Sequence, residues 1–159
     1  MINPAQIHLA LNHVPVVLAI LTLPLLTWAM LKNNSTIRNL SWGLLAVAAV
    51  FATPVYFTGE GAEELVEHKP AVTEDYIHEH EEAAEVAIIL IAITGVAGAA
   101  ALAMVQLKKN IPTALPIAIL IANLVSAGAL LRTAHLGGLV RHDELRVSAA
   151  VSSNKSTSV

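Results

Sequence analysis

Long apolar stretches separated by short polar ones dominate the chain. Four of them run over residues 4–31, 37–57, 74–107 and 111–136, to within a residue or two. Each is long enough to cross a bilayer, which requires about 20 apolar residues in helical form. Asn3 and Pro4 suit the start of a helix, and Gly137-Gly138 is expected to end the fourth one. The pattern predicts an all-α, integral membrane four-helix bundle over residues 1–147, with a disordered tail over 148–159.

The composition agrees with this prediction. Of the 159 residues, 55% are hydrophobic and 13% are charged, whereas soluble domains carry about 25% charged residues. The absence of cysteine excludes disulfides, thiolate metal sites and c-type haem attachment. The net charge is −3 and no basic run suggests a nucleic-acid partner. No Lys or Arg precedes the first apolar stretch, as it would in a cleaved signal peptide, so we expect this stretch to stay as a membrane helix.

Charge distinguishes the two ends of the helices. The two tight connections and their edges contain no acid and four bases: Lys32, Arg38, Lys108 and Lys109. Ten of the twelve acids lie between Glu60 and Glu85, around the long connection over residues 58–73. Because positive loops stay in the cytoplasm, both termini and the acidic connection are predicted to face outward. This orientation describes a multi-pass protein of the bacterial inner (cytoplasmic) membrane, with the acidic connection over its periplasmic mouth.

With this topology every histidine falls at or beyond the outer end of a helix. On the first helix, His13 is one turn deeper than His8 and precedes Pro15, which can bend the helix toward the bundle. We therefore expect His13 to point inward. The sequence does not decide whether His8 lies in the headgroup region or in the site. Its helix face continues through small and polar residues, namely Asn12, Pro15, Ala19 and Thr22.

Two further helices supply candidate residues. His80 shares a helix face with Gly95 and Gly98, which mark a close-packing seam, so His80 is expected to point inward and His78 to be solvated. Glu85 lies a turn deeper than the other acids and is a candidate metal ligand, hydrogen-bond partner or proton carrier. On the fourth helix the candidates are His135 and, in a short amphipathic piece after the glycines, His142. Arg132 and Arg141 suit pairing with haem propionates.

Two short motifs resemble those of a broad family of bacterial four-helix membrane proteins that is known only as a domain of unknown function. The segment HLALNHVP, with His8, His13 and Pro15, is similar to the family's opening motif, although Leu9 replaces a proline and Val14 an aromatic residue. The segment GGLVRH, ending at His142, is similar to a longer closing motif, and His80 or His78 matches a histidine at the start of the third helix. The resemblance implies a four-helix fold and these site residues. Some family members are fused to cytochrome c domains, which implies redox work.

Three functions remain open at this point. The first is electron transfer through a b-type haem held by histidines, since helical bundles build cofactor sites from facing side chains, with Phe51, Tyr56 and Phe57 as candidate wall residues. The second is a directly bound Cu, Zn or Fe ion, because imidazole suits all three. The third is a structural or assembly subunit of a larger membrane complex.

The expected partners are the lipid bilayer and either a periplasmic cytochrome or other subunits of a membrane complex. The sequence does not decide whether the chain forms a homo-oligomer. Nothing in the sequence decides whether the protein is an enzyme.

Overall fold

A computed structural model describes residues 3–59, 61 and 74–141, and this part of the chain is helical, with no strand. The helices are α1 (Pro4–Leu11), α2 (His13–Leu31), α3 (Ser35–Phe57), α5 (Glu74–Gln106) and α6 (Ala114–Arg141). Four segments are long and apolar enough to cross a membrane, with α1 and α2 together forming the first. The all-α fold is therefore confirmed, as are four helical segments that are long and apolar enough to span a membrane.

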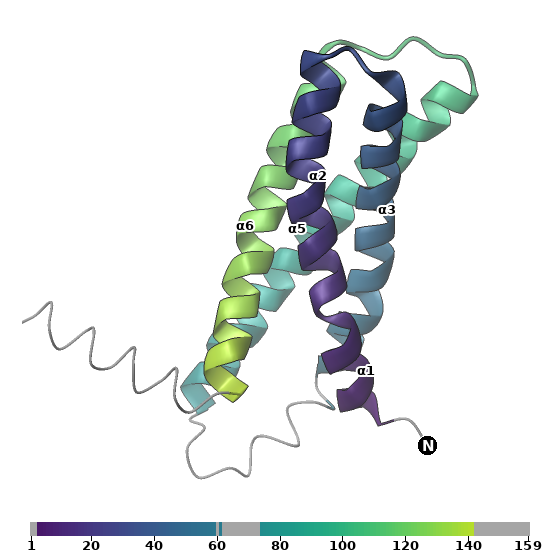
Figure 1. Cartoon of the computed structure of the whole chain (residues 1–159). Coiled ribbons are helices and arrows are strands. Elements are labelled where there is room, and N and C mark those ends of the chain that lie inside the picture. Colours follow the sequence, from purple (N-terminus) through teal and green to yellow (C-terminus); the bar gives the residue numbers. More distant parts are fainter. Residues whose placement is uncertain (1–2, 60, 62–73, 142–159) are drawn as a thin grey trace, which may run out of the picture.

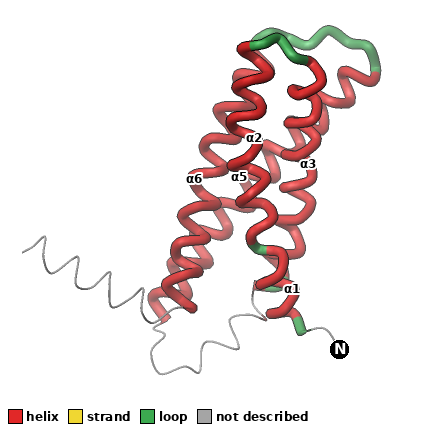
Figure 2. Tube along the Cα trace, viewed as in Figure 1, coloured by secondary structure: helices red, strands yellow, loops and turns green. Residues whose placement is uncertain are grey.

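The four long helices alternate in direction and form a bundle (Figure 1). Helix α3 packs between α2 and α5, and α6 packs against the opposite sides of the same two helices. The connections α2–α3 and α5–α6 lie together at one end, called the tight-loop end below (Figure 2). Helix α1 and the last turn of α6 lie at the other end, called the histidine end. The bundle therefore brings the candidate residues of α1, α2, α5 and α6 to the same end.

The first span is divided at Asn12, three positions before Pro15. Asn3 caps α1, since its side chain accepts a hydrogen bond from the Ala5 N–H at 3.0 Å while Gln6 accepts one from the Asn3 N–H at 3.3 Å. Helix α1 ends at Leu11 and α2 begins at His13. Pro15 has no N–H to donate to the Leu11 carbonyl, which accounts for the break at this point. The expected interruption near Pro15 is therefore present, whereas the inward His13 expected from it is not.

Helices α3 and α5 approach each other most closely at two glycines. A Cβ on Gly98 would lie 2.8 Å from the Trp42 carbonyl oxygen, and a Cβ on Gly95 would overlap the Cβ of Ala49. Only residues without a side chain permit this spacing, as at other close helix contacts in membrane proteins. The seam predicted from Gly95 and Gly98 is confirmed, and it faces α3.

Buried polar side chains connect helices in the middle of the bundle. Thr94 and Ser126 hydroxyls are 2.9 Å apart across α5 and α6. The Asn123 amide of α6 donates to the Ala19 carbonyl of α2 at 3.1 Å. Such interhelical bonds contribute about 1 kcal/mol each in membrane bundles. They fix α6 against both neighbouring helices.

Helix α6 is longer than the sequence predicts. It continues through Gly137-Gly138 to Arg141, so the expected stop at residue 136 is wrong. No glycine in the described part of the chain has a positive φ, so these two keep ordinary helical geometry. Gly137 instead packs against the His80 ring. The acidic connection (60 and 62–73) and the tail from 142 onward lie outside the described residues.

Candidate cofactor site

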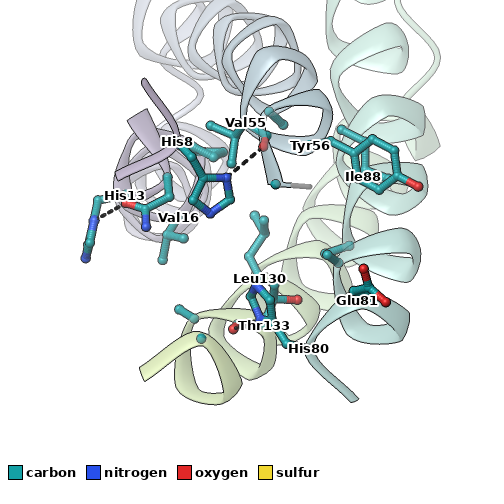
Figure 3. Close-up of a pocket in the computed structure, with 18 of the residues that line it drawn as sticks. His8, His13, Val16, Val55, Tyr56, His80, Glu81, Ile88, Leu130 and Thr133 are labelled. Atoms are coloured by element: carbon teal, nitrogen blue, oxygen red, sulfur yellow. Dashed lines mark hydrogen bonds between the residues drawn. The ribbon is translucent and has the colours of Figure 1, made fainter. Parts of the chain in front are cut away.

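A cavity of about 800 Å³ opens at the histidine end, among all five helices. This volume is within the range of about 300–1,000 Å³ that is usual for ligand pockets. Its walls are mostly apolar and include Val16, Ile88 and Leu130 (Figure 3). The polar side chains that line it are His8, Asn12, His13, Tyr56, His80, Glu81, Glu85 and Thr133. An apolar cavity with a few polar groups has the character of a small-molecule site.

His8 enters this cavity from α1. Its ring is partly buried, and its Nδ1 lies 2.9 Å from the Val55 carbonyl oxygen (Figure 3). A carbonyl only accepts, so Nδ1 carries the proton and donates. The Val55 carbonyl is available because it is one of the last four in α3, which lack the usual partner within the helix. The end of α3 thereby fixes both the ring direction and the tautomer of His8.

His80 enters the cavity from α5, on the opposite wall (Figure 3). Its Nδ1 donates to the Thr133 carbonyl of α6 at 3.1 Å. Gly137 leaves room for the His80 ring to make this contact, since a Cβ there would lie 3.0 Å from His80 Cε1 and 3.4 Å from His80 Nδ1. A side chain at this position would displace the ring. The prediction that His80 points inward is confirmed, and Gly137 provides the space for it.

The two rings share one chemical arrangement. Each anchors Nδ1–H on a backbone carbonyl, which leaves Nε2 unprotonated with its lone pair available. In the described part of the chain, neither Nε2 has a hydrogen-bond partner. A histidine that binds a metal almost always donates its other ring N–H to such a group, which fixes its orientation and raises its basicity. His8 and His80 are therefore two prepared nitrogen ligands on facing walls.

His13 does not take the inward position predicted for it. It is exposed at the rim of the cavity, and its Nδ1 is hydrogen-bonded to the neighbouring Asn12 side chain (Figure 3). His13 is five positions after His8, so the two side chains would face about 140° apart on a continuous helix. With His8 on the inward face, His13 therefore faces outward.

The remaining candidates are dispersed. His135 and Arg132 are exposed on α6 and are not among the residues that line the cavity. Glu85 lines the cavity but is exposed. Arg141 is the last residue of α6, and His142 lies outside the described residues.

His78 is solvated as predicted, at 3.3 Å from Glu82. Of the described candidates, only His8 and His80 place a partly buried ring on the cavity wall.

The sequence held a usable signal for His8. Pro15, Ala19 and Thr22, which continue its helix face, are all buried in the bundle. This stripe of small and polar residues identifies the inward face, and His8 extends it by two turns. The partner carbonyls of Val55 and Thr133 left no such signal, because every residue carries the same backbone group. Tyr56 and Phe57 line the cavity as expected from the sequence, whereas Phe51 does not.

Comparison of the chain with models of protein families, with curated proteins and with solved structures finds no match. The resemblance of its two short motifs to a membrane-protein family therefore stays a prediction.

Proposed function

We propose that this membrane protein binds a b-type haem between His8 and His80 and acts in electron transfer. One observation carries the proposal. On facing walls of one cavity, each of these histidines anchors Nδ1–H on a backbone carbonyl, at 2.9 Å and 3.1 Å, and keeps Nε2 free. Haem iron takes imidazole nitrogen as an axial ligand, and helical bundles hold cofactors between facing helices.

The geometry favours haem over a directly bound ion. A single ion needs several ligands within about 2.0–2.2 Å of one point. Among the described residues, no group of three His, Asp or Glu side chains is placed to provide this. A planar macrocycle instead needs a wide apolar space with one ligand on each side, and the cavity of about 800 Å³ offers that. A Cu, Zn or Fe site is therefore the second candidate.

The protein's own residues would position the haem and tune it. When bound, the haem supplies a one-electron couple. The Nδ1–H bonds to Val55 and Thr133 hold both imidazoles in place and make Nε2 a stronger donor. The apolar wall, with Val16, Ile88 and Leu130, would shield one part of a bound haem from water, which is another control on the potential. In the described part of the cavity, no Arg or Lys lines the wall, so pairing of Arg132 with a propionate has no support here.

The orientation belongs to the same proposal. The four bases of the tight-loop end and the acids near the start of α5 support a bundle with both termini outside, by the positive-inside rule. The haem would then lie near the periplasmic face of a bacterial inner membrane. A periplasmic cytochrome or another subunit of a membrane complex would exchange electrons with it there.

The absorption spectrum of detergent-purified protein tests this function. A Soret band with α-bands that appear on reduction is the expected result. Stoichiometric Cu, Zn or Fe by elemental analysis without those bands would support the directly bound ion instead. Protein purified from haem-replete cells with neither haem nor metal would contradict both, and would leave the role of an assembly subunit.

A further inference from the structure

The tight-loop end contains a second cavity, at the opposite end of the bundle from the histidines. Its volume is about 280 Å³. The polar residues of its wall are Asn33, Asn34, Arg38 and Thr113, and the apolar part comes from α2 and from the segment that begins α6, including Pro112 and Pro116. The cavity therefore joins a cationic, amide-rich wall to an apolar one at the end of a membrane bundle.

Arg38 is only partly exposed, yet it has no acidic partner. Residues 1–59 and 86–142 contain no Asp or Glu. Within the described residues, the Arg38 side chain makes no hydrogen bond or ion pair, and its buried Nε lacks any acceptor. The guanidinium lies 4.9 Å above the Trp42 ring, which holds it in place. Arginine stays charged in proteins, so this cation lacks a counter-charge from the described chain.

The cavity wall includes a buried polar atom without a partner. In the described part of the chain, four buried side-chain atoms have no hydrogen bond, and among them Nε of Arg38 belongs to a residue that lines this cavity. Buried polar groups are nearly always satisfied, so such a group points to a ligand, ion or water. Asn34 uses its side-chain oxygen to cap α3 at Ile37, 3.0 Å away, which leaves its NH₂ group as a donor. The wall therefore offers donors and a positive charge to an anion.

We propose that this cavity binds the phosphate of an anionic phospholipid. The guanidinium fork of Arg38 suits two phosphate oxygens, with the Asn34 amide beside it. The acyl chains would lie along Pro116 and Ile117, which share the cavity wall with Arg38. Basic pockets between membrane helices bind such headgroups, and Lys32 and Lys108 add to the positive field at this end. The proposal is independent of the haem site.

Native mass spectrometry of delipidated protein tests the site, with phosphatidylglycerol, phosphatidylcholine or inorganic phosphate added in detergent. We expect one phosphatidylglycerol to bind preferentially. Arg38→Gln should weaken its binding about tenfold or more, since hydrogen bonds to charged groups are lost. Arg38→Lys should weaken it less, because the charge stays but the fork is lost. Lys109→Gln, which removes an exposed charge at the same end, should leave the first lipid bound with nearly wild-type affinity.

Three results would overturn the proposal. Equal binding of phosphatidylcholine would show that charge is not recognised. Equal losses in Arg38→Gln and Lys109→Gln would show a general attraction to the basic end. Inorganic phosphate that binds alone with the same dependence on Arg38 would replace the lipid with a free anion. Circular dichroism and gel filtration of each variant distinguish a lost site from a lost fold, and Arg38→Lys keeps the test valid if Arg38→Gln does not fold.

Discussion

At the scale of the residue, the proposed site depends on two imidazoles held by their Nδ1 atoms. The bonds to Val55 and Thr133 do not themselves hold a haem, but they decide which nitrogen faces the cavity. A rotated ring would present its N–H instead and lose the lone pair needed for coordination. The space around each ring is therefore as important as the ring itself, and Gly137 controls that space for His80.

Gly137→Ala tests this dependence. The new methyl group would start 3.0 Å from His80 Cε1, so the ring must shift away from the Thr133 carbonyl. We expect a clear loss of bound haem per protein in the purified variant, measured from the Soret absorbance. Gly128→Ala in the same helix is the control, because a Cβ there meets nothing within 4 Å. Equal haem content in the two variants would show that Gly137 has no role in positioning His80.

At the scale of the element, apolar length and a few capping residues were sufficient to predict the helices. The observed bounds of α1 and α2 taken together, of α3 and of α5 lie within about two residues of the predicted ones. Two features could not be predicted from apolar length and capping residues. The two glycines near the end of α6 carry no sequence signal that distinguishes a helix stop from a packing gap, because the difference is made by His80 on another helix. The stripe of small and polar residues identified the inward face of α1. The prediction nevertheless assigned the inward position to His13, because His13 lies deeper in the span than His8.

The contact between α3 and α5 provides a second test at this scale. In Gly98→Ala the Cβ would lie 2.8 Å from the Trp42 carbonyl oxygen, so the helices must separate. Overpacking of this kind costs about 1–3 kcal/mol. We expect the free energy of unfolding in mixed detergent–denaturant micelles to fall by that amount. Gly128→Ala should instead be neutral, or stabilising by up to about 1 kcal/mol through helix propensity. Equal stability of the two variants would contradict the close contact.

At the scale of the whole molecule, the bundle keeps its two kinds of chemistry apart. The histidine cavity lies where α1 begins and α6 ends, and the basic cavity with Arg38 lies at the opposite end. Apolar side chains such as Val50, Ile93, Val96 and Leu124 are exposed along the helices between these ends, which is consistent with contact with lipid. An electron carrier near one membrane face and a lipid headgroup near the other would fit one orientation in the bilayer.

Reporter fusions test that orientation. We expect fusions at Asn34 and Asn110 to report a cytoplasmic location and a fusion at Ser153 a periplasmic one, because the bases without acids flank the two tight connections. The reverse pattern would place the histidine cavity at the cytoplasmic face. It would contradict the proposed exchange of electrons with a periplasmic partner, while leaving the fold unchanged.

Titration of haem-free protein with haemin is the decisive test of the proposed ligand pair. We expect one haem per chain with the spectrum of a low-spin, two-imidazole complex. His8→Ala and His80→Ala should each lose that spectrum, while His13→Ala should keep it, since His13 is exposed at the rim and hydrogen-bonded to Asn12. Loss of the low-spin spectrum in His13→Ala, with retention in His8→Ala, would contradict the assignment of His8 and His80 as the haem ligands.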